Sequence, residues 1–259
     1  MNLSNVTELS IGFERFGAVG GQGVVYFDSI RLYSHDRQLI TPVEPSAAGL
    51  AAHYEFESTT NDSSGNGLHG TAMGDPTFEA GKMGQAISLD GFNDYVEIPD
   101  SPSLDITDAI TIAAWAFREV DSGSWERIVA KSDSTLWDYW LQITPSGTIG
   151  GGFTDTEDIT HTNLDLVSGS SIPLNQWTHL AFVYDGTYFK GYVDGQLDKS
   201  EDIGSFTIRT STRPLWIGRL QDSYDFGGLI DDVRIYERAL SPAEIGWLGG
   251  ATKPFDKPF

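Results

Sequence analysis

The sequence predicts an all-β protein, built as a sandwich or barrel of antiparallel strands. First, its 29 glycines in 259 residues exceed the roughly 7% of average proteins, and 11 prolines add to the turn-forming residues. Second, turn signals recur about every 8 to 12 residues from Leu50 onward, at 61–67, 90–91, 145–147, 185–186 and 194–195. Third, helical signals are nearly absent. Many short strands joined by tight turns are therefore expected.

The composition excludes several classes of protein. Asp and Glu number 37 against 16 Lys and Arg, and the net charge of −21 argues against nucleic acid as the partner. Hydrophobic residues make up 39% of the chain, enough for a folded core. No run approaches the ~18 apolar residues of a membrane span, so membrane insertion is not expected. The N-terminal segment lacks the pattern of a signal peptide. The absence of cysteine excludes disulfides and zinc–thiolate sites.

The chain divides into four parts. Residues 24–33 (VVYFDSIRLY) and 228–236 (GLIDDVRIY) share the pattern Asp-x-[Ile/Val]-Arg-[Leu/Ile]-Tyr. Residues 1–35 are too few for a stable domain, so we expect the end of a preceding β-sandwich or a docking extension. A linker is expected at 36–49, the main domain at 50–250 and a C-terminal tail at 251–259.

Within the main domain, individual elements can be predicted in order. Residues 111–117 (TIAAWAF) and 177–184 (WTHLAFVY) indicate strands, and the second is apolar enough to be covered on both faces. The strand at 188–193 is closed into a hairpin by Asp194-Gly195, which suits a type I′ turn. One short helix is expected, with Ser241 as N-cap, Pro242 at its first position and Glu244 completing a capping box.

Residues 53–245 resemble the LamG-like jelly-roll group of the concanavalin A-like lectin/glucanase superfamily. The similar segments are HYEFE at 53–57, DSSGNGLHG at 62–70, GKMGQAISLDGFNDYVEIP at 81–99, ITIAAWAF at 110–117, QWTHLAFVYDG at 176–186, YVDGQ at 192–196 and GLIDDVRIYERALSPAEI at 228–245. The resemblance implies a two-sheet antiparallel jelly roll with a short C-terminal helical turn. This fold carries lectins, adhesion modules and enzymes alike, so it does not fix the function.

A calcium site is the strongest local prediction. The segment from Asp62 to Asn66 places oxygen-bearing side chains at alternate positions before Gly67, like the first half of an EF-hand loop. Further carboxylates are expected from Glu57, at the end of the domain's first strand, and Asp231, at the start of its last. The first and last strands of a jelly roll pair, and alternation points Asp231 to the interior with Val233. The resemblance also implies a structural calcium near the termini.

The alternative to calcium needs no ion. Asp62 and Asn66 would then cap an Asx-type turn, and Asp231 would accept backbone hydrogen bonds.

Aromatic residues are the candidates for ligand binding, because their faces stack on the apolar side of a sugar ring. Trp125 lies in a turn-rich loop, and Tyr224 lies in another. Trp137 and Tyr139 alternate with Trp140 along one strand, so one set is expected in the core and the other exposed. The ligand contacts predicted are Trp125, Trp137, Tyr139 and Tyr224, with a hydrophobic-cover role as the alternative for each.

No catalytic residue is predicted. The Glu-x-Asp-x-x-Glu signature of retaining glycosidases is missing, and the nearest carboxylate pair, Asp155 and Glu157, is expected in a solvated loop. Enzyme activity is therefore not supported by the sequence, although the fold would allow it.

The leading hypothesis is a non-catalytic binding module of a secreted or cell-surface protein, carbohydrate-binding and stabilised by calcium. Its partner would be a polysaccharide or cell-surface glycan, either neutral or acidic and bridged by calcium, since the net charge repels polyanions. A structural or adhesive module is the alternative, binding copies of itself or a longer parent chain in a sheath, fibre or surface layer. A polysaccharide hydrolase or lyase is the second alternative.

Overall fold

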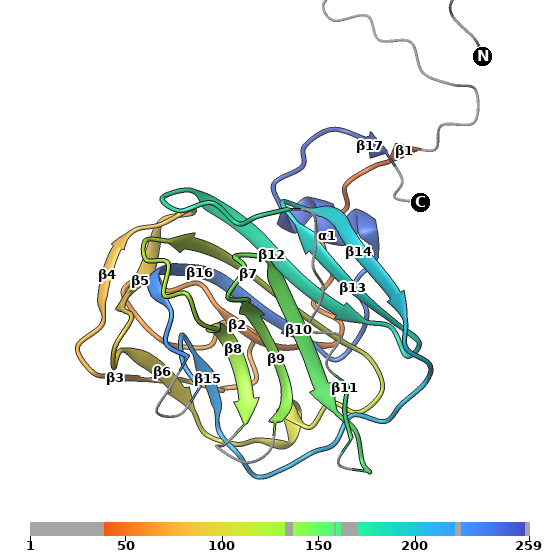
Figure 1. The fold of residues 1–259 in the computed structure, drawn as a ribbon, viewed down its shortest axis with the longest axis horizontal. Coiled ribbons are helices and arrows are strands. Elements are labelled where there is room, and N and C mark those ends of the chain that lie inside the picture. Colours follow the sequence, from red (N-terminus) through yellow and green to blue (C-terminus); the bar gives the residue numbers. More distant parts are fainter. Residues whose placement is uncertain (1–38, 133–136, 158, 162–169, 221–223, 257–259) are drawn as a thin grey trace, which may run out of the picture.

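Two antiparallel β-sheets packed face to face form the molecule in a computed structural model, as the sequence predicts (Figure 1). The structure describes residues 39–132, 137–157, 159–161, 170–220 and 224–256. The expected extension at 1–35 lies outside these residues. No helix in the described part is long and apolar enough to span a membrane.

One sheet has seven strands in the order β11-β10-β9-β8-β15-β6-β3. They are β3 (Thr71–Met73), β6 (Tyr95–Ile98), β8 (Glu126–Ser132), β9 (Trp137–Ile143), β10 (Ile149–Thr154), β11 (Thr160–His161) and β15 (Leu215–Ile217). Strands β8, β9 and β10 lie side by side at the front of Figure 1. The candidate ligand residues Trp137 and Tyr139 lie on β9.

The other sheet runs β14-β13-β12-β7-β16-β5-β4, and β2 also pairs with β16. Its strands are β2 (Leu50–Tyr54), β4 (Thr77–Ala80), β5 (Gln85–Asp90), β7 (Ile110–Arg118), β12 (Trp177–Tyr184), β13 (Tyr188–Val193), β14 (Gln196–Asp202) and β16 (Gly227–Tyr236). The predicted pairing of the first and last strands of the domain is confirmed, with Tyr54 opposite Val233. Strand β12 is buried from Thr178 onward, as expected for a strand covered on both faces.

The main core lies between the sheets and is rich in aromatic rings. Phe182 and Phe189 meet edge to face at 5.1 Å, and the ring of Phe153 reaches across from the other sheet to 5.3 Å from Phe189. All three side chains are fully buried. Edge-to-face contacts of this kind stabilise the core beyond the apolar area that they bury.

The short helix and the hairpin form as predicted. Helix α1 (Pro242–Leu248) begins after Ser241, whose side chain and that of Glu244 form the expected capping box. Asp194 and Gly195 both have positive φ, 49° and 74°, as a type I′ turn requires. A 3₁₀ helix, η2 (Pro102–Leu104), follows β6.

Helix α1 covers part of the outer face of the eight-stranded sheet. Its buried residues Ile245 and Leu248 pack with Val183 and Tyr236 of the sheet. The expected linker and tail meet nearby, where β1 (Leu39–Ile40) pairs with β17 (Phe255–Asp256) (Figure 1). The start of the described part of the linker therefore pairs with the C-terminal tail.

Candidate functional site

The turn at 62–66 is closed by hydrogen bonds to the Asp62 carboxylate. It accepts three backbone N–H bonds, from His53 (2.9 Å), Ser64 (2.9 Å) and Leu68 (3.1 Å). Burial opposes ionisation of Asp62, but these bonds outweigh it and hold the pKa below its ordinary value. Asn66 donates through Nδ2 to the carbonyls of Leu50 and Ala51, both at 2.9 Å. These are the contacts of a capped turn.

Glu57 lies outside the first strand of the domain, contrary to the prediction. Strand β2 ends at Tyr54, and the chain then turns through a positive φ of 53° at Phe56. The Glu57 side chain is exposed and accepts the backbone N–H of Gln85 at 3.1 Å.

Asp231 is buried as expected but faces the other way. It lies within β16, where a bulge before Arg234, with Asp232 at a φ of 46°, breaks the alternation that the prediction assumed. Asp231 pairs with Trp115, on the face opposite the core residue Val233. Its carboxylate accepts the Met83 N–H at 2.9 Å, and burial raises its pKa to about 6.

The four predicted calcium ligands therefore do not converge as a single set. Throughout the described residues, no three His, Cys, Asp or Glu side chains form a group that could hold a metal ion. Asp62 and Asn66 hold one turn, whereas Glu57 and Asp231 bind the backbone at 83–85.

Tyr139 belongs to the core and cannot stack on a surface ligand. Its side chain is 1% exposed, and its hydroxyl donates to the carbonyl of Leu104 at 3.1 Å. A bulge at Asp138 in β9 separates it from Trp137, because two residues of β9 oppose one of β8 there. Trp137 consequently shares a face with Trp140, and their rings meet at 5.5 Å and 75°.

Trp137 and Trp140 are part of an outer aromatic cluster on the face of the seven-stranded sheet that points away from the core. Its members are Tyr95, Ala130, Trp137, Trp140, Trp216, Leu220 and Tyr224. Trp140 and Trp216 are buried, whereas the rings of Tyr95, Trp137 and Tyr224 are half-buried at its edge. These half-buried rings give the cluster an accessible aromatic surface.

Arg127 lies among these rings. A bulge at Ile128 in β8 turns Arg127 away from the core face that Val129 occupies. Its guanidinium carbon is 5.3 Å from the ring centre of Trp140, 5.5 Å from that of Tyr224 and 5.6 Å from that of Trp137. These distances are within the range of cation–π attraction.

The structure brings together two of the predicted ligand residues, Trp137 and Tyr224, around Arg127. The Tyr224 carbonyl also accepts the Arg127 backbone N–H at 3.0 Å, which fixes the loop on the sheet. Trp125 is half-buried in the loop before β8, and no ring contact joins it to the described members of the cluster.

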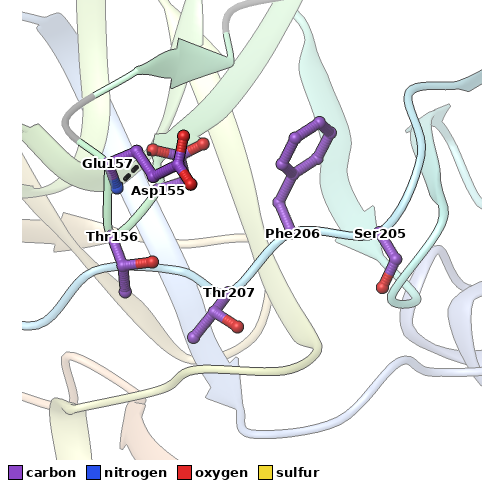
Figure 2. A pocket seen from close by; sticks show the side chains of 6 residues that line it. All are labelled: Asp155, Thr156, Glu157, Ser205, Phe206 and Thr207. Atoms are coloured by element: carbon purple, nitrogen blue, oxygen red, sulfur yellow. Dashed lines mark hydrogen bonds between the residues drawn. The ribbon is translucent and has the colours of Figure 1, made fainter.

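A pocket at the end of β10 is a second candidate site. Figure 2 shows the carboxylates of Asp155 and Glu157 on one side and the ring of Phe206 on the other, and the pocket has a volume of about 320 Å³. Thr156 and Glu157 are exposed, as expected of a solvated loop, but for Asp155 this expectation is wrong. Asp155 is 3% exposed, and its Oδ1 accepts the N–H groups of Glu157 (2.8 Å) and Ile159 (2.9 Å), which caps this turn.

Residues 90–246, more than half of the chain, match the family described as the concanavalin A-like lectin/glucanases superfamily. The chain belongs to this superfamily. A search among curated proteins found no significant match.

Solved structures share the fold of this chain. The chain is 26% identical to domain 4 of the extracellular arabinanase AbnA of Geobacillus stearothermophilus, solved in complex with arabinotriose, with a TM-score of 0.65. The match covers 78% of this chain and 98% of that domain.

Toxin binding domains share the fold at lower identity. The binding domain of Paraclostridial Mosquitocidal Protein 1 is 17% identical, with a TM-score of 0.63, and the botulinum neurotoxin serotype G binding domain is 16% identical, with a TM-score of 0.62. The matches cover 78% of this chain and 52% and 50% of those domains. The chain thus spans about half of each toxin domain.

The sequence prediction missed Trp140 and Trp216 as members of the outer aromatic cluster, and it missed Arg127, which lies among the rings. Trp216 lies on β15, a strand of three residues whose position in the sheet no local pattern indicates. Arg127 did leave a signal, since an arginine within the apolar run of β8 has to be accommodated by particular neighbours.

Proposed function

We propose that this chain is a non-catalytic carbohydrate-binding module of a secreted or cell-surface protein. The observation that carries the proposal is the outer aromatic cluster, where the rings of Trp137 and Tyr224 flank Arg127. The arabinotriose bound to the similar arabinanase domain supports a sugar as the ligand.

The cluster has the chemistry that sugar recognition needs. Half-buried aromatic faces stack on the apolar side of a sugar ring, and neighbouring amide and guanidinium groups bind its hydroxyls. Gln142 lies beside Arg127, its pairing partner on β9, and accepts a hydrogen bond from its Nη1. The glycine opposite Gln142, Gly150 of β10, adds no side chain to this face, and a Cβ there would lie 3.2 Å from Gln142.

Trp137→Ala tests the proposal. We expect it to weaken retention of arabinotriose and of arabinan by about tenfold or more, as for an aromatic residue central to an interface. The melting temperature should fall only slightly, because Trp137 is half-buried rather than enclosed. Isothermal titration and thermal melting measure the two effects.

Glu157→Gln is the matched control, since it changes the pocket of Figure 2 and leaves the cluster intact. Loss of binding in this variant, with Trp137→Ala unaffected, would move the site to that pocket. If the unmodified chain binds no polysaccharide and sediments as an oligomer, the assembly alternative replaces the proposal.

The proposal includes the prediction that calcium stabilises the folded chain, and it assigns no set of ligand residues to the ion. A cation that binds only the folded chain adds roughly 2.7 kcal/mol at a hundredfold excess over its dissociation constant. We therefore expect a higher melting temperature in calcium than in chelator. Equal melting temperatures would contradict calcium binding, and the hydrogen bonds of Asp62 and Asn66 would then account for the turn at 62–66.

A further inference from the structure

Arg127 is a buried cation that has no carboxylate partner in the described part of the chain. Its side chain is 4% exposed, and none of the described residues offers it a carboxylate within 4.0 Å, in a chain that has 37 acidic residues. Every other described arginine has one, and these are Arg118, Arg209, Arg213, Arg219, Arg234 and Arg238. Arg127 is therefore an exception that requires a physical reason.

The protein groups around Arg127 compensate its charge only in part. Three aromatic rings and the Gln142 side-chain oxygen contact the guanidinium, but no described residue offers an acceptor to the buried Nε. The indole N–H of the neighbouring Trp140 is also buried and finds no acceptor among the residues that the structure describes. Burial lowers the pKa of Arg127 to about 9, with only Tyr224 acting in the opposite direction. An uncompensated buried cation and two unmet donors are costly, and an anion at this place would offset that cost.

The carboxylates on the same face are already engaged. Glu97 accepts the indole N–H of Trp216 at 3.1 Å, and Asp225 lies 3.0 Å from Arg219. Neither supplies the missing counter-charge of Arg127. Among the described residues no carboxylate is left to serve Arg127, so the geometry favours an acceptor supplied by a bound molecule.

We propose that Arg127 binds the carboxylate of a uronic acid residue in an acidic polysaccharide. This inference rests on the proposed function, because it assigns the ligand class of the same aromatic site. The planar guanidinium matches a carboxylate in geometry and charge, while Trp137 and Tyr224 stack on the sugar ring.

The net charge of −21 does not oppose this assignment at short range. Long-range repulsion lowers the association rate and is screened by salt, whereas the contact at a desolvated cation determines how long the ligand stays bound. The net negative charge of the chain would repel a heavily sulfated glycan more strongly, while the glycan would make the same contact with Arg127.

The experiment compares three probes by isothermal titration: trigalacturonate, arabinotriose and a sulfated disaccharide. We expect trigalacturonate to bind the unmodified chain most tightly, and Arg127→Gln to weaken it by about tenfold or more. Arg238→Gln is the matched control, since it removes the same charge at an arginine that pairs with a carboxylate, Glu244, and lies beside Tyr236 of the other sheet. It should change the affinity by less than about twofold.

The outcomes separate the inference from the proposed function. If arabinotriose binds as tightly as trigalacturonate, or Arg127→Gln leaves the uronate affinity unchanged, the uronate assignment is wrong while the carbohydrate-binding module stands. Preference for the sulfated probe would also overturn it. If no probe binds, both fail.

Stability distinguishes a ligand group from a structural cation. Arg127→Gln removes an uncompensated buried charge, so we expect an unchanged or higher melting temperature. Arg127→Lys keeps the charge and loses the planar fork, and it should still weaken uronate binding. A large drop in melting temperature for Arg127→Gln, together with full uronate affinity in Arg127→Lys, would make Arg127 structural and refute the inference.

Discussion

Replacing Glu126 by glutamine is expected to lower the free energy of unfolding by about 3–5 kcal/mol, because the change leaves a buried arginine without its main counter-charge. Glu126 is fully buried at the start of β8. Its two oxygens accept Nε and Nη2 of Arg118 at 2.7 and 2.8 Å, and Arg118 is itself only 3% exposed. This bidentate pair raises the pKa of Arg118 above its ordinary value.

Urea denaturation measures the effect of Glu126→Gln. Asp121→Asn is the control, because Asp121 also contacts Arg118, at 2.7 Å, but is 57% exposed and should contribute far less. Replacing Arg118 by methionine and Glu126 by leucine together should recover much of the lost stability, since no unpaired charge then remains. Equal effects of Glu126→Gln and Asp121→Asn would show that this buried pair contributes little.

The same carboxylate organises the loop that carries Trp125. Glu126 Oε1 accepts both the N–H (3.0 Å) and the hydroxyl (2.9 Å) of Ser122. Glu126→Gln should therefore loosen the loop before β8, and any part of Trp125 in ligand binding would show as a loss of affinity in this variant.

Local chemistry made several elements predictable. The N-cap of α1 depends on Ser241, Pro242 and Glu244 within a single turn of helix. The hairpin depends on the adjacent pair Asp194 and Gly195, which adopt positive φ with little strain. Such elements carry their determinants within a few residues, so sequence alone indicates them.

The faces of the site residues were not predictable, because bulges decide them. One extra residue at Asp138 moves Trp137 to the outer face, and another at Ile128 does the same for Arg127. A bulge depends on how two strands pair across the sheet, and neither strand records this in its own pattern. The conformation of Asp232 likewise reverses the expected face of Asp231.

The exceptional position of Arg127 also depends on tertiary structure. Its neighbours Trp137 and Gln142 come from β9, whereas Tyr224 comes from the loop before β16. A sequence gives the number of carboxylates but not which cations they reach. The uronate assignment therefore depends on the ion pairs of the other arginines, which only the folded chain determines.

Lowering the pH is expected to reduce the stability of the folded chain, because a histidine is buried in its neutral form in the eight-stranded sheet. His179 on β12 is 1% exposed, and the centres of its ring and the Trp115 ring are 5.3 Å apart. Its Nδ1 has no hydrogen-bond partner within the described ranges. Burial lowers its pKa from 6.5 to about 4; Asp232 opposes this shift, and Arg234 and Lys82 add to it. The folded chain therefore resists protonation at a pH where the unfolded chain accepts the proton.

The sign and the range of the effect follow from these two pKa values. As the pH falls from about 6.5 to about 4, the unfolded state binds the proton first, so stability is lost across this interval and is fully present above it. A difference of about 2.5 pKa units corresponds to at most about 3 kcal/mol. His179→Phe abolishes the titration. Lowering the pH over this interval should therefore destabilise the unmodified chain relative to the variant by about that amount.

Asp231, which also pairs with Trp115, titrates in the same range with the opposite sign. Its pKa is raised from 3.8 to about 6, so acidification relieves the cost of its buried charge and favours the folded chain. The unmodified chain should therefore show a flattened pH profile, and His179→Phe and Asp231→Asn should reveal opposite slopes in urea denaturation between about pH 6.5 and pH 4. Parallel slopes in the two variants would mean that His179 is protonated in the folded chain.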